Sequence, residues 1–224
     1  LDHWMGSPGF YRWAISNPFT RWVTRRRAAQ LFEVMAGFVH SQVLLACVRL
    51  DLFVLLRERA MTLEQLAQHA RMSAPAMQRL LQSAVALRLL AWRGEQTYGL
   101  GPLGAPVAAD PGLRLMIEHN AVLFDDMRDP LALLRDEIQP HMQAYWPYMN
   151  GDNPQGWEAE KVARYSELMS ASQRFVIEEL LASYDFSAHR QVLDIGGGKG
   201  GWVLALAQHL PKLRLHLMDL PPVA

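Results

Sequence analysis

A run of six residues that includes five glycines, residues 196–201, most constrains how this chain of 224 residues can fold. The residues before it, 191–195, read Gln-Val-Leu-Asp-Ile, which is typical of a short buried strand. A helical pattern follows over residues 202–210, and a second strand is predicted over residues 213–218. Glycines let the backbone pass close under a ligand, and the helix N-terminus then points at that ligand. This order predicts the opening of a nucleotide-binding βαβ unit.

The charge at the end of the first strand indicates which ligand the turn would accept. Gly196, Gly198 and Gly201 fit the pattern G-x-G-x-x-G, which alone is weak support for a dinucleotide. Asp194 would face the pyrophosphate of such a ligand, and two unit charges at ~4 Å repel by about 4 kcal/mol at an effective dielectric near 20. S-adenosylmethionine has no phosphate and carries a sulfonium and an ammonium group. The sequence therefore favours S-adenosylmethionine over NAD(P).

Two further residues belong to this motif. Asp219 follows the second predicted strand, where a carboxylate can accept hydrogen bonds from two ribose hydroxyls. Lys199 is less expected within the turn, and we predict that its side chain points to solvent. The alternative interpretation is a glycine turn that only connects a strand to a helix.

The motif resembles that of a known family. Residues 194–200, together with the Asp-Leu-Pro-Pro-Val of residues 219–223, resemble the small-molecule O-methyltransferases of the plant caffeic acid and animal acetylserotonin type. Within that family, residues 41–50, 98–104 and 129–135 are most similar to bacterial carotenoid enzymes that methylate a tertiary 1-hydroxyl, of the hydroxyneurosporene or demethylspheroidene type. The family begins with a winged-helix dimerisation domain, so the resemblance covers almost the whole chain.

The resemblance implies a cofactor, S-adenosyl-L-methionine, and a small hydrophobic hydroxylated substrate, a hydroxycarotenoid. The positions that match the family's cofactor site are Asp194, Gly196, Gly198 and Asp219. Met169 matches a methionine that in relatives lines the pocket near the methyl donor, although a methionine in this pattern is more often a core residue. The family's acceptor-activating histidine corresponds to a position beyond Ala224, so we assign no catalytic residue and no metal ligand. His119 and His141 are interpreted as packing or surface residues.

The N-terminal half of the chain has the pattern of a winged helix. Thr62 begins one short helix, Ser73 caps a second, and residues 89–93 and 97–100 form two strands around a turn. We therefore predict a mainly α, winged-helix dimerisation domain followed by the start of an incomplete α/β, Rossmann-like methyltransferase domain. A Gly- and Pro-rich stretch places the boundary between residues 1–108 and 109–224.

A long helical pattern precedes the winged helix. It spans residues 28–59, and its second half is apolar on nearly every side, so something must bury it. We expect a partner chain and predict a homodimer through this helix and the winged helix. Further helices are predicted over residues 113–126, 130–139 and 158–183.

The predicted sheet would be small. A parallel sheet is stable only when both of its faces are covered, and two strands with one helix cannot achieve this. The family resemblance implies seven strands, so we expect this chain to lack most of the cofactor domain and to be inactive alone.

The first 27 residues combine aromatic residues with five arginines and the single acid Asp2. Trp and Tyr favour the bilayer interface and arginines favour anionic lipid, so this segment predicts peripheral contact with a membrane. Alternatively, the aromatic residues pack on a partner subunit. The uncharged run between Glu33 and Arg49 is short for a transmembrane helix, and we expect a cytoplasmic protein that can associate with membranes.

The chain carries 22 basic and 22 acidic side chains, which gives no support to nucleic-acid binding. A winged-helix DNA-binding regulator is one alternative, but the second helix offers only Gln78, Arg79, Gln82 and Arg88 to DNA. A non-catalytic dimer scaffold is the other alternative.

Overall fold

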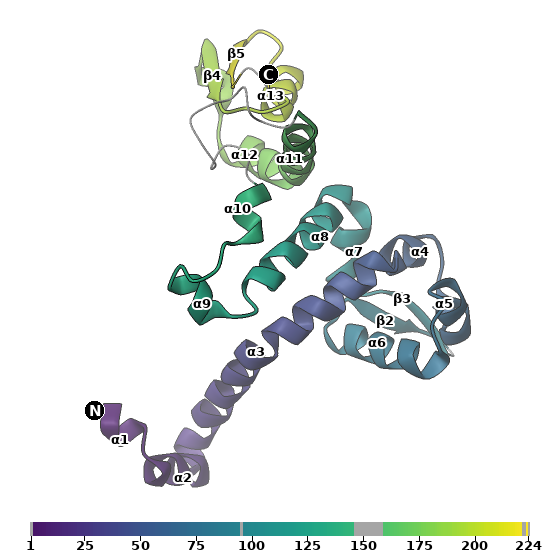
Figure 1. The fold of residues 1–224 in the computed structure, drawn as a ribbon, viewed down its shortest axis with the longest axis vertical. Helices are drawn as coiled ribbons and strands as arrows, with labels where there is room; N and C mark the ends of the chain where they lie inside the picture. The colour runs from purple at the N-terminus through teal and green to yellow at the C-terminus, as the bar shows by residue number, and fades with distance from the viewer. Residues whose placement is uncertain (1, 95, 146–158, 221–222, 224) are drawn as a thin grey trace. The chain divides into compact units, whose positions relative to one another are not determined.

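The computed structural model describes residues 2–94, 96–145, 159–220 and 223 (Figure 1). The chain divides into two compact units, residues 1–46 and residues 47–224, which are described separately. The first unit is helical, and its elements are α1 (Asp2–Met5), α2 (Pro8–Ser16) and most of α3 (Pro18–Arg49).

Short polar side chains determine where the helices of the first unit begin. Ser7 caps α2 by accepting a hydrogen bond from the backbone N–H of Phe10, and Asn17 accepts one from Phe19 ahead of α3. The Thr20 hydroxyl donates to the Ala14 carbonyl at 2.7 Å, which holds α2 against the first turns of α3. We did not predict α1 or α2 from the sequence, although Phe10, Trp13 and Ala14 of α2 recur at helical spacing.

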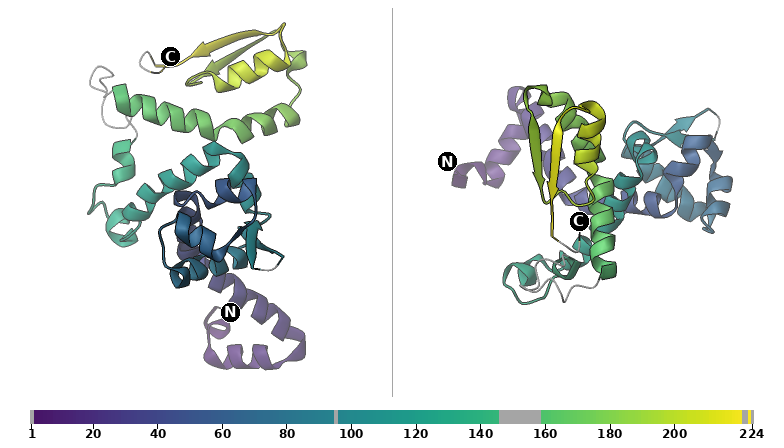
Figure 2. Two further views of the ribbon diagram at one scale, coloured as in Figure 1. Left: turned by 90° about the vertical axis from the view of Figure 1, so that its right-hand side faces the viewer. Right: turned by 90° about the horizontal axis from the view of Figure 1, so that it is seen from above.

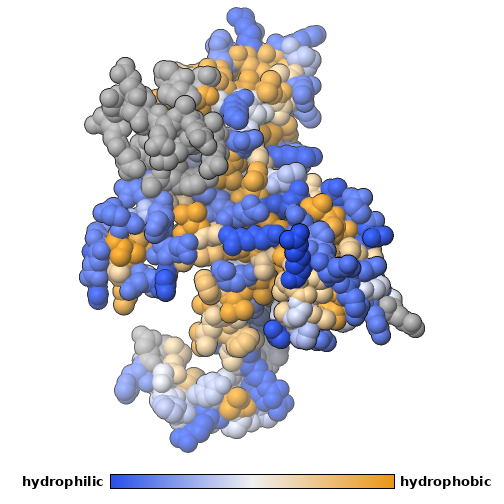
Figure 3. Space-filling view, turned by 45° about the vertical axis from the view of Figure 1, so that its right-hand side comes forward, coloured by the Kyte–Doolittle hydropathy of each residue, from blue (hydrophilic) through white to orange (hydrophobic). Residues whose placement is uncertain are grey.

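The middle of α3 is apolar and exposed. Figure 3 shows apolar side chains along this helix, and those in its middle that are more than half exposed are Leu31, Phe32, Val34, Met35, Phe38 and Val39. By length and composition alone, α3 is able to cross a membrane, since one stretch of 18 residues has a mean hydropathy of 1.7 and is only 17% buried. In water, such a surface favours a partner that covers it.

The second unit begins with the predicted winged helix. Its three strands form an antiparallel sheet in the order β1-β3-β2, and its core is buried between this sheet and the helices. The helices begin as predicted, since Thr62 and Gln65 form a reciprocal capping box and Ser73 accepts from the backbone of Ala76. The elements are α4 (Leu52–Glu58), β1 (Met61–Thr62), α5 (Leu63–His69), α6 (Ala74–Ala86), β2 (Leu90–Arg93) and β3 (Thr97–Leu100).

The prediction of one helix over residues 28–59 is wrong at both ends, because α3 already begins at Pro18 and stops before the predicted end. α3 stops at Arg49, and α4 starts at Leu52 in a new direction. The change occurs at Asp51, whose φ of 53° lies in the left-handed region that Asp tolerates better than most residues. The break lets α4 bury Leu52 and Phe53 completely.

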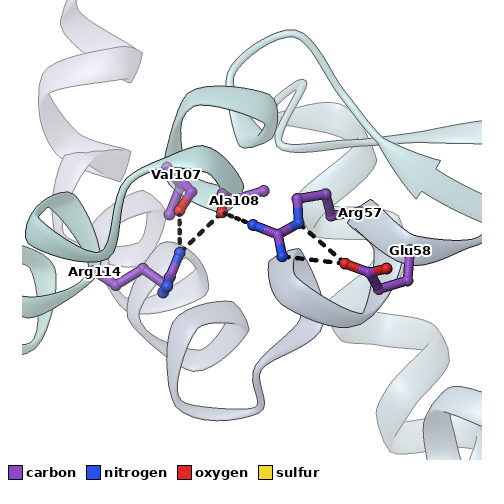
Figure 4. Close-up of polar contacts among 5 residues, drawn as sticks. All are labelled: Arg57, Glu58, Val107, Ala108 and Arg114. Carbon is purple, nitrogen blue, oxygen red and sulfur yellow. Dashed lines mark hydrogen bonds and ion pairs between the residues drawn. The ribbon is translucent and has the colours of Figure 1, made fainter.

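Two arginines bind the end of α7 (Gly104–Ala109), one from the winged helix and one from α8 (Pro111–Asp126). Arg114 of α8 donates to the carbonyls of Val107 and Ala108 at 2.9 and 3.0 Å (Figure 4). Arg57 of α4 donates to the same Ala108 carbonyl and pairs with Glu58. The last carbonyls of α7 lack hydrogen-bond donors within the helix, and the guanidinium groups of the two arginines donate to them instead.

The remaining helices are shorter than predicted. The pattern over residues 130–139 gives only one short helix, because the chain turns at Asp136 with a φ of 56°. The pattern over residues 158–183 is divided near Gln173 into two helices. The elements are α9 (Pro130–Leu134), α10 (His141–Tyr145), α11 (Ala159–Ser172) and α12 (Arg174–Ser183), followed by a 3-10 turn (Phe186–Ala188).

The predicted βαβ unit consists of β4 (Gln191–Ile195), α13 (Gly201–His209) and β5 (Arg214–Met218). The strands are parallel, with Ile195 paired to Met218, and α13 lies against one face (Figure 2). On the other face, Leu193 and Ile195 are 55% and 68% exposed. The prediction of a buried strand is therefore wrong for this face, because no described helix covers it.

Candidate functional site

The site lies at the carboxyl edge of the two-stranded sheet. Because β4 and β5 are parallel and in register, Asp194 near the end of β4 and Asp219 after β5 lie at the same edge. The glycine turn begins there, and the Gly196 N–H donates to the Met218 carbonyl at 2.7 Å. Ligands of open α/β sheets bind at this edge.

Three glycines give the turn its shape. Gly196, Gly198 and Gly200 have φ values of 77°, 57° and 76°, which side chains with a Cβ rarely adopt. Gly200 also donates to the Gly197 carbonyl at 2.9 Å, which closes the turn before α13. The backbone is thereby exposed to a ligand without intervening side chains.

Asp219 is held in place by the turn. Its Oδ2 accepts a hydrogen bond from the Gly198 N–H at 2.6 Å, and its Oδ1 accepts one from the Leu220 N–H at 2.6 Å. A carboxylate oxygen has two lone pairs, so each oxygen keeps room for one more donor. The arrangement fits a ligand with two adjacent hydroxyls.

Asp194 has the opposite character. Its Oδ2 is buried and accepts no hydrogen bond from any residue that the structure describes. Burial, and then the nearby charge of Asp219, raises the pKa of Asp194 above its usual value. A Cβ on Gly197 would lie 2.3 Å from this oxygen, so the turn approaches the carboxylate as closely as glycine permits. A buried acceptor without a donor is costly. Asp194 is not among the described residues that line the neighbouring pocket, so its carboxylate can act on a ligand there through its charge.

A pocket of about 320 Å³ extends from the turn to α11 and to Gln173, which follows that helix. Met169 is part of its wall, and its contact with a ligand stays a prediction. The other residues that line it are Tyr165, Ser166, Ser170, Gln173, Gly196, Gly197, Gly198, Lys199, Asp219, Leu220 and Val223.

Sequence reasoning missed most of the helical wall. Tyr165, Met169 and Gln173 follow one another at i, i+4 spacing, and this spacing could have identified them once Met169 was chosen. Burial raises the pKa of Tyr165, which keeps its hydroxyl protonated as a donor. Lys199, which we expected to point to solvent, is exposed and also lines the pocket.

The two histidines that we set aside lie elsewhere in the unit. His141 begins α10, and its Nδ1 lies 2.8 Å from Oδ1 of the buried Asp126. Burial acts to raise the pKa of Asp126, but hydrogen bonds from the backbones of Met142 and His141 and from the His141 ring outweigh it and lower that pKa. Burial lowers the pKa of His119, which favours its neutral form. Neither histidine is among the described residues that line the pocket.

Comparison with known families tests whether the site belongs to a methyltransferase or to an NAD(P) enzyme. A family model described as an O-methyltransferase dimerisation domain matches residues 32–109, and one described as an O-methyltransferase domain matches residues 131–224. The chain belongs to the O-methyltransferase family. The predicted fold class is thereby confirmed, whereas the exact boundary at residue 108 stays a prediction.

Curated relatives agree with this assignment. Demethylspheroidene O-methyltransferase of Cereibacter sphaeroides is 40% identical over 219 residues, which are 98% of this chain and 58% of that protein. The Rhodobacter capsulatus protein of the same name is 38% identical over 92% of this chain and 52% of its own length. This chain thus spans little more than half the length of these relatives.

Solved structures share the fold. The pyocyanin biosynthetic protein PhzM has a TM-score of 0.69 at 22% identity, over 88% of this chain and 59% of that chain. The structure titled "PigF with SAH" has a TM-score of 0.62 at 25% identity, over 87% of this chain and 59% of that chain. Human N-acetylserotonin methyltransferase has a TM-score of 0.61 at 21% identity, over 88% of this chain and 60% of that chain.

Proposed function

We propose that the whole protein is an S-adenosylmethionine-dependent O-methyltransferase that acts on a hydroxyl group of a small hydrophobic molecule, a hydroxycarotenoid. The observation that carries the cofactor assignment is the pair of aspartates at the glycine turn, one without a donor and one held in place. The substrate class is supported by the names of the relatives from Cereibacter sphaeroides and Rhodobacter capsulatus.

The residues of the site fit this cofactor. Asp219 would accept hydrogen bonds from the two ribose hydroxyls, and the charge of the nearby Asp194 would attract the ammonium group. Gly196 and Gly198 leave space for the ligand to contact the backbone. When bound, S-adenosylmethionine supplies an electrophilic methyl group on a positively charged sulfur. The negative charges of both aspartates favour a positively charged ligand.

The contribution of this chain to the chemistry is positioning. The wall that includes Met169 and Tyr165 would orient the acceptor hydroxyl toward the cofactor side of the pocket, and holding two reactants in place lowers the entropic barrier to their reaction. The acceptor proton must be removed by a base, which we assign to none of the described residues.

Cofactor binding can be tested by calorimetry with S-adenosylmethionine. Changing Asp219 to Ala should weaken binding about 10- to 100-fold, since a hydrogen bond to a charged group contributes ~1.5–3 kcal/mol. Asp125→Ala, at an exposed position of α8, is the matched control and should leave the affinity unchanged. Unchanged affinity in the Asp219 variant, or tighter binding of NADH than of S-adenosylmethionine, would contradict the proposal.

We also propose that the protein is a homodimer. The match to a dimerisation domain supports this, as do the exposed apolar side chains of α3 between Leu31 and Val39. Val34 is 79% exposed, so Val34→Asp should dissociate the dimer without disturbing the fold of one chain. Light scattering on both proteins at micromolar concentration would measure this, and a wild-type monomer would contradict it.

The bare face of the small sheet leads to a further expectation. Leu193 and Ile195 leave an apolar surface in water, and a parallel sheet in this state is poorly stabilised. We propose that residues 1–224 alone do not transfer methyl groups. Transfer of a labelled methyl group to a hydroxycarotenoid by this purified chain would contradict the proposal.

A further inference from the structure

The first turns of α3 carry an exposed aromatic and basic face. Phe19, Trp22, Val23 and Arg26 follow one another at the i, i+3, i+4 and i+7 positions of the helix. Phe19 is 92% exposed and Trp22 is 66% exposed. The Arg26 guanidinium lies 5.7 Å from the centre of the Trp22 ring. We call these four residues the N-terminal face.

The N-terminal face points away from the interior of its own unit. The opposite side of α3 contacts α2, where Thr20 donates to the Ala14 carbonyl at 2.7 Å. Thr24 donates to the Thr20 carbonyl on the same side. α2 therefore covers one side of α3 and leaves the aromatic side in water.

The charge around this face is unbalanced. Residues 1–27 contain five arginines and one acid, which leaves 17 basic and 21 acidic side chains in the rest of the chain. Arg21, Arg25 and Arg26 are exposed, and the described residues include no carboxylate that forms an ion pair with them. A neutral protein thus presents a locally cationic surface with aromatic side chains at its centre.

We propose that the N-terminal face, together with the exposed Arg21 and Arg25 of the same helical turns, binds the surface of an anionic lipid bilayer. Tryptophan and other aromatic side chains favour the headgroup region, and each arginine near anionic lipid strengthens binding about fivefold, the equivalent of ~1 kcal/mol. This proposal is independent of the proposed methyl transfer.

A second copy of the chain is a poorer occupant. A symmetric contact through this face would bring the arginines of both chains together, and like charges oppose such a contact. The family's dimerisation match begins at residue 32, after this face ends.

The contact is with the bilayer surface and does not cross it. Although α3 is long and apolar enough to span a membrane, its last turn contributes Cys47 and Val48 to the buried core of the second unit. A span through this helix would have to remove these side chains from that core. Interfacial binding requires no such change.

Binding can be measured by flotation of the whole chain with vesicles of equal parts phosphatidylglycerol and phosphatidylcholine. Replacing Arg21, Arg25 and Arg26 by Gln should weaken binding about a hundredfold. Phe19→Ser with Trp22→Ser should also abolish most binding, and both positions are exposed, so circular dichroism should be unchanged. The matched charge control replaces three exposed arginines elsewhere by Gln, namely Arg79, Arg128 and Arg135.

Two controls separate lipid binding from dimerisation. Val34→Asp should dissociate the dimer, whereas the Phe19/Trp22 variant should remain dimeric. Quenching by brominated lipid should decrease in Trp22→Phe and persist in Trp92→Phe, which changes an exposed tryptophan of the winged helix. Three results would overturn the proposal. The first two are equal binding to pure phosphatidylcholine and wild-type binding by the triple Arg variant. The third is dissociation of the dimer by Phe19→Ser with Trp22→Ser.

Discussion

The winged-helix region and the glycine-turn region differ in how their side chains are packed. In the first, α4, α5 and α6 bury Phe53, Leu66 and Leu81 completely around a small antiparallel sheet. In the second, Leu206 of α13 is fully buried, while Leu193 and Ile195 lie exposed on the far face of the sheet. The polar groups show the reverse distribution, because the turn region contains the ordered Asp219 and the donor-less Asp194.

This difference suggests a division of roles. Apolar burial is the main source of stability, so the winged helix is expected to be the stable part of the second unit. The turn region contains buried polar groups that are satisfied only in part, which costs stability and favours a ligand. Stability and ligand binding are thus located in different segments.

The largest expected effect is on the core of the winged helix. Leu81→Ala should lower the free energy of unfolding by about 2–5 kcal/mol, since it leaves a cavity at a fully buried position. The same substitution at Leu193 should change it by less than about 0.5 kcal/mol, because the side chain is already in water. Urea denaturation of both variants would measure this, and equal losses would remove the contrast between the regions.

Cofactor should protect only one region. At a concentration of S-adenosylmethionine about 100 times its Kd, binding stabilises the segments that contact it by up to ~2.7 kcal/mol. Hydrogen exchange should therefore slow by about a hundredfold in β4, α13 and β5. The amides of β1, β2 and β3 should exchange as before. Uniform protection of both regions would show that they unfold together.

The hydrogen bonds that link α7 to its neighbours should contribute less to the free energy of unfolding than the core of the winged helix does. Arg114→Ala removes two hydrogen bonds to the last carbonyls of α7 and should lower the free energy of unfolding by ~1–2 kcal/mol. Glu58→Ala removes only an exposed ion pair with Arg57 and should change it by less than ~1 kcal/mol. Thermal unfolding of both variants would test this order, and a larger loss for Glu58→Ala would contradict it.

Replacing the Asp194 carboxylate should have a small effect on stability and an opposite effect on binding. Its raised pKa means that the folded state binds the proton more tightly than the unfolded state. The charged Asp194 therefore destabilises the fold fully at a pH above the pKa that it has in the folded state. This destabilisation is relieved as the pH falls through that pKa. Asp194→Asn should remove this pH dependence, raise stability by less than ~1 kcal/mol and weaken S-adenosylmethionine binding.

Parallel denaturation and calorimetry against pH would check the two directions. Asp125→Asn is the control, because its exposed side chain should alter neither quantity. A loss of stability together with unchanged affinity would show that Asp194 is purely structural.

The sequence predicted those elements whose boundaries are marked by local chemistry. Thr62 and Ser73 cap helices where expected, and the glycine turn joins a strand to a helix as expected. It did not predict breaks made by one residue in the left-handed region, since the apolar period continues across Asp51 and Asp136. The hydrophobic period reports on burial and does not report the direction of the chain.

The site was predicted only in part for a similar reason. Asp194 and Asp219 were identified from their position after strands, and the structure brings both to one edge of the sheet. Tyr165 and Ser166 lie in α11 and Gln173 follows it, and only tertiary packing brings them to the turn. The donor-less oxygen of Asp194 also depends on packing and could not be read from residue type.

The hydrogen bond from Gly198 to Asp219 has a kinetic consequence. It joins two segments 21 residues apart and arranges the turn in the absence of any ligand. The conformational entropy of the glycines in the turn is therefore lost during folding rather than when the ligand binds. A ligand that meets a preformed site should associate in a single phase, with an observed rate that rises linearly with its concentration and no slow rearrangement step.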